Sequence, residues 1–212
     1  NSYLTSFDLI ENFEKKKIYK NFLTPLLGDH NIKNILASIS VSRELKISYP
    51  KIKKALKAFS GVKRRFTIIY KSRHNLIIDD YAHHPVEIEE TLKSLKQITK
   101  NEIISIFEPH RYSRMSKMIN EFIHCFKNSN YIFILPVFSA GEKKINNIDS
   151  TLFYEKLRKK YSYKKVYLSE PNKSFFDTLK KKMTPGNNII FLGAGLSSKT
   201  ANQFKNYFKK EC

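Results

Sequence analysis

The chain has 212 residues and a formal net charge of +20, and 41% of its residues are hydrophobic and 13% aromatic. This composition is typical of a globular protein and excludes a disordered polypeptide. The length allows one large domain, or a small domain with part of another. No apolar run reaches the roughly 18 residues that a membrane-spanning helix needs, so we expect no membrane insertion.

The positive charge is compatible with a nucleic-acid partner, but its distribution favours a compositional origin. Most of the 39 basic residues are lysines dispersed over expected helix surfaces, in a chain that is also rich in Asn and Ile. We therefore expect no nucleic-acid partner, and tight, steeply salt-dependent DNA binding would contradict this. Cys125 and Cys212 have neither metal-ligand nor disulfide spacing, which favours a cytoplasmic location.

The first sixty residues predict two strands followed by two helices. Apolar patterning favours strands over Tyr3–Ile10 and Ile18–Leu27. The first helix should begin near Asn31 with Asp29 as its N-cap, and the second should end at Gly61.

From residue 64 onward, short apolar strands alternate with amphipathic helices. We expect, in chain order, strands near 65–70, 76–78, 103–107, 131–135, 166–168 and 189–192, and helices at 85–98, 113–126, 150–160, 172–182 and after Ser197. This alternation predicts an α/β fold, a Rossmann-like and mainly parallel sheet with helices on both faces.

The change of pattern predicts two domains, residues 1–63 and residues 64–212. The first segment is too small to bury its own core well, so we interpret it as a partial α/β remnant, the C-terminal part of a larger domain. The chain begins at Asn1 in mid-pattern, which favours a fragment with a missing N-terminal portion, although a processed product would look the same.

Polar side chains follow four of the expected strands at their carboxyl ends. They occupy 79–84, 108–114, 139–142 and 193–195. Because ligands bind at this edge of open α/β sheets, the sequence predicts one site built from these loops.

Each cluster also has a simpler structural explanation. Asp80 could cap the following helix, and His83 and His84 could be surface residues, since no carboxylate–histidine spacing completes a metal site. Arg111 and Arg114 lie three apart at an expected helix start, where they would oppose the macrodipole, and this favours an anionic ligand.

The loop at 193–195 and two polar pairs upstream each allow a functional and a structural interpretation. Gly193-Ala194-Gly195 could admit a ligand close to the backbone or simply form a tight turn. Asn31 and Asn34 could hydrogen-bond a flat heterocycle or belong to a turn and a cap. Arg64 and Arg65 could hold phosphate or anchor the linker.

Taken in order, the motifs resemble the Mur ligases. The matching segments are GDHNIKN (28–34), AFSGVKRRF (58–66), IDDYAHHPVEI (78–88), EPHRYSRM (108–115), FSAGEKKI (138–145) and FLGAGLSS (191–198). Within that family, the HRYSR segment is more similar to the alanine-adding ligases than to the ligases that recycle murein tripeptide.

The resemblance implies an ATP-dependent ligase of peptidoglycan precursor synthesis that joins L-alanine to UDP-N-acetylmuramate through an acyl phosphate. It implies that residues 1–63 belong to an ATP-binding central domain and residues 64–212 to an amino-acid-binding domain. ATP and Mg²⁺ would be required. The main Mg²⁺ ligands and the glycine-rich phosphate loop are expected in the missing N-terminal portion, with no metal ligand in this chain.

The resemblance also assigns roles to particular positions. It implies catalytic roles for His83, His110, Arg111 and Arg114, substrate contacts for Tyr81, His84 and Glu142, and ATP contacts for Asn31, Asn34, Arg64, Arg65 and Asp80. Ala82 and Leu196 depart from the family pattern. We expect this chain alone to be inactive. A non-catalytic nucleotide-binding or interaction module remains an alternative.

Overall fold

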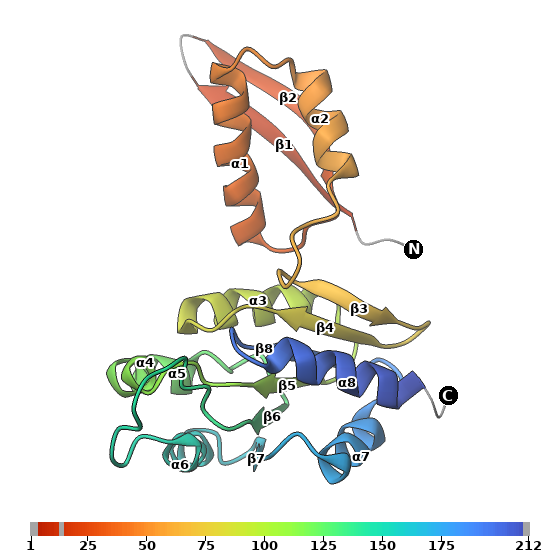
Figure 1. Cartoon of the computed structure of the whole chain (residues 1–212). Helices are drawn as coiled ribbons and strands as arrows, with labels where there is room; N and C mark the ends of the chain where they lie inside the picture. Colours follow the sequence, from red (N-terminus) through yellow and green to blue (C-terminus); the bar gives the residue numbers. More distant parts are fainter. Residues whose placement is uncertain (1–3, 13–14, 210–212) are drawn as a thin grey trace. The chain divides into compact units, whose positions relative to one another are not determined.

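In the computed structural model, which describes residues 4–12 and 15–209, the chain divides between Val62 and Lys63 into two units (Figure 1). The smaller unit holds an antiparallel pair, β1 (Thr5–Asn12) and β2 (Lys16–Thr24), and two helices, α1 (Asp29–Glu44) and α2 (Tyr49–Ala58). The unit is centred on a small apolar cluster made of Phe22, Ile35, Ile39 and Ile52.

Several predicted boundaries in this unit are wrong, including the end of β1, which lies at Asn12 and not at Ile10. Gly28, with φ of 91°, is the N-cap of α1, and Asp29 is its first helical residue. α2 ends at Ala58 because Phe59 already has extended backbone, three residues before the expected stop. β2 runs over Lys16–Thr24, two residues earlier at its start than predicted and three at its end. The predicted first residue of β1, Tyr3, lies outside the described residues.

The larger unit alternates strands and helices as predicted. Its elements are β3 (Thr67–Lys71), β4 (Leu76–Asp80), α3 (Pro85–Ile98), β5 (Ile103–Phe107), α4 (Tyr112–Lys117), α5 (Ile119–His124), β6 (Tyr131–Ile134), α6 (Ser150–Lys160), β7 (Lys165–Leu168), α7 (Lys173–Lys182), β8 (Asn188–Leu192) and α8 (Ser197–Lys209). They form one sheet in the order β3-β4-β8-β5-β6-β7. Only β3 is antiparallel to its neighbour, which confirms the mainly parallel sheet.

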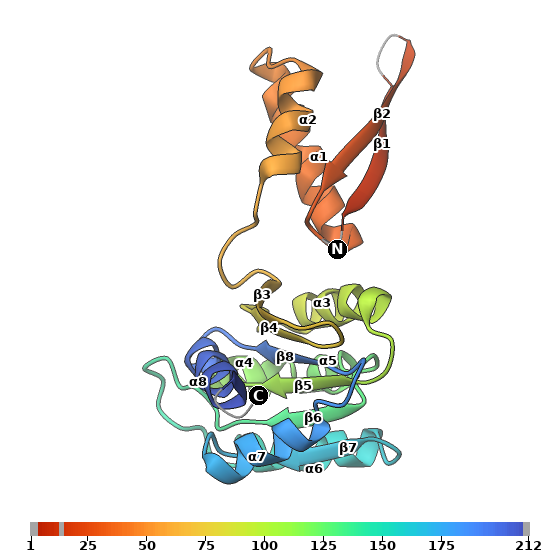
Figure 2. The same ribbon diagram turned by 90° about the vertical axis from the view of Figure 1, so that its right-hand side faces the viewer.

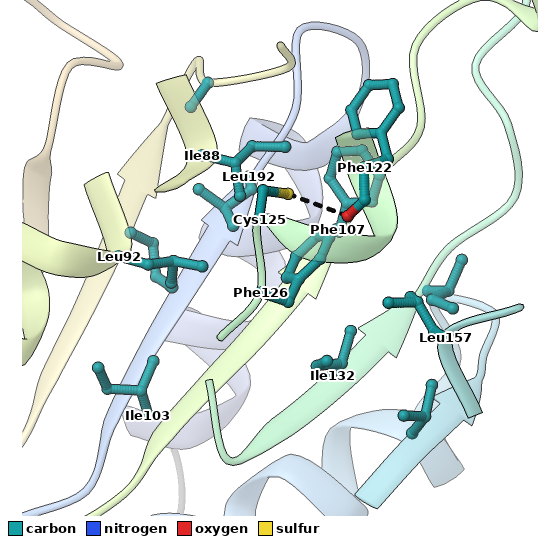
Figure 3. Packing of buried hydrophobic residues seen from close by; sticks show 14 of the residues in the cluster. Ile88, Leu92, Ile103, Phe107, Phe122, Cys125, Phe126, Ile132, Leu157 and Leu192 are labelled. Atoms are coloured by element: carbon teal, nitrogen blue, oxygen red, sulfur yellow. Dashed lines mark hydrogen bonds between the residues drawn. The ribbon is translucent and has the colours of Figure 1, made fainter. Parts of the chain in front are cut away.

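Helices cover both faces of this sheet (Figures 1 and 2). On one face α3, α4, α5 and α6 pack around a core in which Phe107, Phe122, Phe126 and Phe153 lie together. Figure 3 shows part of this core, with the Cys125 thiol donating to a backbone carbonyl. On the other face α7 and α8 pack against a second apolar cluster. Because both faces are covered, β4, β5, β6 and β8 are buried along their whole length.

Two differences from the prediction bear on the site. The single helix expected over residues 113–126 is broken at Met118, and nothing in the local sequence explains the break. α4 therefore has only six residues, and Arg114 lies in its last turn as well as near its start. A helix this short has a weak macrodipole, so the position of Arg111 and Arg114 at its start does not by itself favour an anionic ligand. β4 also continues through Asp79 and Asp80 instead of ending at Ile78.

Candidate functional site

Two loops that follow β4 and β5 bring three predicted site residues together. These strands both pair with β8 and run parallel to it, so their carboxyl ends lie at the same edge of the sheet. The rings of His83 and His110 lie 5.4 Å apart, centroid to centroid, and the ring of Tyr81 lies 5.0 Å from that of His83. The predicted convergence of the two loops is confirmed for these side chains.

Hydrogen bonds define which nitrogen of each imidazole carries the proton. Nδ1 of His83 lies 2.9 Å from the Tyr81 carbonyl oxygen, which can only accept, so this nitrogen donates. Nδ1 of His110 lies 3.3 Å from Nη1 of Arg114, which can only donate, so this nitrogen accepts. When both rings are neutral, His83 keeps a lone pair on Nε2 and His110 keeps a proton on Nε2.

The electrostatic surroundings favour these neutral forms. Burial lowers the pKa of the His110 imidazole from 6.5 to about 4, and the nearby His83, Arg114 and Arg111 act in the same direction. Burial also lowers the pKa of His83, although the hydrogen bond to the Tyr81 carbonyl opposes this. At neutral pH the pair therefore offers one acceptor and one donor without an imidazolium charge.

Two consecutive arginines flank the Tyr81 ring, but their guanidinium groups are placed differently. The Arg64 guanidinium lies 4.8 Å from the ring centroid and donates to the Gly193 carbonyl at 2.8 Å. The Arg65 guanidinium lies 5.5 Å from the centroid, and its Nη1 is 3.8 Å from an oxygen of Glu87, with 56% of its side chain exposed. Arg64 is thus engaged with backbone, whereas Arg65 can reach a ligand in solvent.

Asp80 and His84 both take part in local turns. The two carboxylate oxygens of Asp80 accept hydrogen bonds from the backbone nitrogens of Phe66 and Ala82, each at 2.7 Å. Burial raises the pKa of Asp80 to about 6. Asp80 is only 4% exposed, so a ribose contact would require this turn to open. His84 is the N-cap of α3 and forms a capping box with Glu87.

The loop after β6 packs against the loop after β5. The ring of Phe138 stacks on that of His110 with centroids 5.5 Å apart. Both oxygens of Glu142 accept from Ser113, one from its backbone nitrogen at 3.0 Å and one from its hydroxyl at 2.6 Å. The sequence singled out Glu142 as a substrate contact, and the structure places its carboxylate on α4.

The turn after β8 is held by a carboxylate and by close packing. Glu108 accepts from the backbone nitrogens of Leu196 and Ser197, at the start of α8. A Cβ on Gly195 would lie 2.4 Å from Cγ of Phe138 and 2.6 Å from Oε1 of Glu108. Phe138 and Glu108 therefore already occupy the space that a side chain at Gly195 would need. This favours the tight-turn explanation for this position.

The two asparagines predicted to contact ATP lie in the smaller unit. The Asn31 side-chain amide donates to the Leu27 carbonyl at 2.7 Å, so its side-chain oxygen is the group that remains for a heterocycle. Asn34 lies one turn further along α1 and is exposed. The Asn31 oxygen and the exposed Asn34 amide are compatible with a nucleotide base.

Sequence reasoning missed several residues that hold the site together. Phe138, Ser113 and Glu87 were not singled out, although the His84-to-Glu87 spacing is that of a capping box and gave a usable signal. Among the described residues, no group of three or more His, Cys, Asp or Glu side chains is placed to hold a metal ion. Within the same ranges, no helix is long and apolar enough to cross a membrane.

The chain is similar in sequence to a known protein family and to several known proteins. Residues 64–195 match the family model described as "Mur ligase, glutamate ligase domain". The chain is 37% identical over 211 residues to the UDP-N-acetylmuramate–L-alanine ligase of Rickettsia bellii, covering 96% of this chain and 44% of that protein. It is also 37% identical to the enzyme of the same name from Ruegeria pomeroyi, covering 92% of this chain and 42% of that protein.

Solved structures show the same fold. The UDP-N-acetylmuramate-alanine ligase of Thermotoga maritima superimposes with a TM-score of 0.73 at 24% identity, covering 93% of this chain and 43% of that one. A murein peptide ligase from Psychrobacter arcticus gives 0.62 at 19% identity, with 93% and 40% covered. The α/β fold and the family match together define a ligase-type domain, and the chain belongs to the Mur ligase family. It spans less than half the length of the curated relatives it matches.

Proposed function

We propose that this chain forms the amino-acid-binding part of an ATP-dependent ligase that joins L-alanine to UDP-N-acetylmuramate in peptidoglycan precursor synthesis. The names of the relatives support the substrates. The observation that carries the proposal is the cluster of His83, His110 and Arg114, which two separate motif segments bring together where β4 and β5 end. Arg111, beside His110, adds a second cation to this edge.

The arginines would stabilise the anionic groups of the reaction. The muramate carboxylate, the transferred phosphoryl group and the carboxylate of alanine are all negative, and guanidinium groups bind such oxyanions with two hydrogen bonds. In acyl transfer of this kind, fixed positive groups that face the developing charge supply a large share of the rate enhancement. Arg111 and Arg114 are the groups that we assign to this task.

The neutral histidine pair suits the amine that must attack. Alanine arrives as an ammonium ion and becomes a nucleophile only after losing a proton. The lone pair on Nε2 of His83 can accept that proton, since its Nδ1 is fixed on the Tyr81 carbonyl. The Nε2 proton of His110 can donate to an oxyanion. These two roles need opposite tautomers, which is the arrangement that the hydrogen bonds favour.

ATP would be contacted by Asn31 and Asn34 through its base and by Arg65 through its phosphates. ATP supplies the phosphoryl group that activates the muramate carboxylate. The principal Mg²⁺ ligands are expected in the part of the relatives that this chain does not cover. For the same reason we expect no turnover by the chain alone, and alanine-dependent phosphate release from the isolated chain would contradict this.

A chimeric ligase tests the proposed function. In this chimera the chain replaces the matching portion of the Rickettsia bellii relative, and phosphate release is measured with ATP, Mg²⁺, UDP-N-acetylmuramate and L-alanine. We expect alanine-dependent release, and a loss on the order of 10²-fold or more in Arg111→Ala. Lys159→Ala, at an exposed position on α6, is the matched control and should be unaffected. A folded chimera that binds ATP but releases no phosphate would refute the proposal.

A further inference from the structure

The loops that follow β5 and β6 are joined along their backbones. Phe138 donates its backbone N–H to the Pro109 carbonyl and accepts from the backbone N–H of Arg111, both at 2.8 Å. His110 and Phe138 thereby form an isolated parallel bridge. The conformation of the loop that carries His110 and Arg111 therefore depends on the loop that carries Phe138.

Arg111 has a backbone conformation that needs external support. Its φ is 72°, in the region that residues other than glycine seldom adopt, and it is the N-cap of the short helix α4. Such conformations persist where surrounding contacts over-determine them, and they concentrate at functional sites. Because α4 has only six residues, its own hydrogen bonds hold its start weakly.

Glu142 supplies a contact that fixes the start of α4 from outside the helix. Ser113 is the second residue of α4, so its backbone N–H has no partner within the helix. The Glu142 carboxylate accepts from this N–H at 3.0 Å and from the Ser113 hydroxyl at 2.6 Å. A tight turn with positive φ at Ala140 and Gly141 brings Glu142 into this position. Hydrogen bonds from Ser113 lower the pKa of Glu142, which keeps it ionised.

The charge of Glu142 is unfavourable for the function of its neighbours. A carboxylate close to Arg111 reduces the positive potential that an anionic substrate would experience. If Glu142 acted only through its charge, its removal would strengthen anion binding. The two hydrogen bonds that Glu142 accepts from Ser113 indicate the opposite outcome, which is weaker anion binding when Glu142 is removed. Without them the segment from Arg111 to Arg114 is no longer held in place.

We propose that Glu142 is a positioning residue that clasps the start of α4 and so holds Arg111 and Arg114 in place for the anionic substrate. The role of the arginines rests on the proposed function, whereas the clasp itself does not. Glu142 thus acts through Ser113 and needs no contact with substrate. This differs from the substrate contact that the family resemblance implied for this position.

Nuclear magnetic resonance on the 212-residue chain tests the clasp with inorganic phosphate as the probe. The first measurement is hydrogen exchange of the Arg111 amide, which donates to Phe138. The second is the phosphate affinity from the side-chain signals of Arg111 and Arg114. In Glu142→Ala we expect faster exchange and weaker phosphate binding, each by about tenfold, the change that loss of one charge-assisted hydrogen bond gives.

Further variants separate the clasp from charge and from folding. Glu142→Gln keeps the volume and one acceptor oxygen, so it should fall between Glu142→Ala and the unchanged chain. Ser113→Ala removes the hydroxyl but keeps the N–H. It provides a second test of the clasp if Glu142→Ala does not fold. Glu155→Ala removes the same charge from an exposed position on α6 and should change neither measurement.

The outcomes are distinguishable. Tighter phosphate binding in Glu142→Ala, with unchanged exchange at Arg111, would overturn the clasp in favour of a purely electrostatic effect. Unchanged exchange at Arg111 in both Glu142→Ala and Ser113→Ala would overturn it as well. If the unchanged chain shows no phosphate signal at either arginine, the assigned role of these arginines fails, and exchange at Arg111 still decides the clasp.

Discussion

The two edges of the parallel sheet carry polar side chains that are used in different ways. At the amino edge, where the strands begin, asparagines complete the backbone hydrogen bonding of the sheet. Asn188 accepts from the Leu76 N–H at 2.7 Å and donates to the Thr99 hydroxyl at 2.9 Å. Asn130 accepts from the Ile103 N–H at 2.9 Å.

At the carboxyl edge the polar side chains are arranged around one another. His83, His110 and Arg114 form ring and hydrogen-bond contacts, and Arg111 is exposed and strained. At the carboxyl edge Asp80 and Glu108 also bind backbone N–H groups, so the two edges differ in the histidines and arginines that only the carboxyl edge gathers. Under the proposed function, substitutions of the amino-edge asparagines should change stability alone, and substitutions of the histidines and arginines at the carboxyl edge should change ligand binding.

The largest stability effect is expected for Asn188→Ala at the amino edge. Both partners of this buried side chain, the Leu76 N–H and the Thr99 hydroxyl, would lose a hydrogen bond. At about 1–3 kcal/mol for each unsatisfied group, we expect the free energy of unfolding to fall by about 3 kcal/mol. Urea unfolding followed by circular dichroism measures this.

If the two edges of the sheet are independent, Asn188→Ala should leave the carboxyl edge unchanged. Phosphate-induced shifts at Arg111 should be the same as in the unsubstituted chain. Asn206→Ala, at an exposed position on α8, is the matched control and should change neither quantity. A change at Arg111 in Asn188→Ala would show that the two edges are coupled.

Each edge of the sheet also has a glycine at which a side chain would be unfavourable. In Gly195→Ala the new Cβ would press on the Phe138 ring and on Glu108, which costs about 1–3 kcal/mol and moves Phe138 against His110. In Gly186→Ala, at the amino edge, the φ of 90° is unfavourable for alanine and the nearest atom belongs to the flexible side chain of Asn101. Both variants should lose stability, but only Gly195→Ala should shift the ring signals of His110.

The periodic parts of the fold could be predicted from the sequence. α3 and β5 have the predicted bounds, because Pro85 fixes a helix start and a short run of apolar residues defines a buried strand. The extension of β4 could not be predicted, since adjacent aspartates are typical of loops. The two aspartates can be buried because residues far away in the sequence bind their carboxylates. For example, the Ser198 hydroxyl donates to Asp79 at 2.6 Å.

The candidate site, like the fold, could be predicted from the sequence only in part. That His83 and His110 meet could be predicted, because loops at the carboxyl ends of parallel strands converge. The position of Glu142 on Ser113 depends on left-handed backbone at Ala140 and Gly141, and the position of Phe138 on close packing against Gly195. Local propensity does not specify contacts of this kind.

Arg111 provides a smaller stability effect of opposite sign. Glycine adopts a φ of 72° without strain, so Arg111→Gly should raise the free energy of unfolding by about 1 kcal/mol while abolishing phosphate binding. Arg111→Ala removes the same guanidinium but keeps the strain, so it should lose binding without this gain. The difference between the free energies of unfolding of the two variants, measured with urea, gives the cost of the strained backbone at this position. Equal stabilities would show that the backbone of Arg111 is relaxed.

The prediction most specific to the carboxyl edge concerns protonation of His110. Its pKa in the fold is about 4 against 6.5 for the free side chain, so below pH 6.5 the unfolded chain binds more protons. The contribution of His110 to stability is therefore fully present above pH 6.5 and is lost as the pH falls toward 4. Arg114→Ala removes both a nearby positive charge and the donor to Nδ1, and both changes favour the imidazolium. We expect the midpoint of the His110 ring signal to move upward in Arg114→Ala and to stay in place in Arg158→Ala, at an exposed position on α6. A midpoint unchanged in Arg114→Ala would mean that burial and the other charged neighbours set this pKa without a contribution from Arg114.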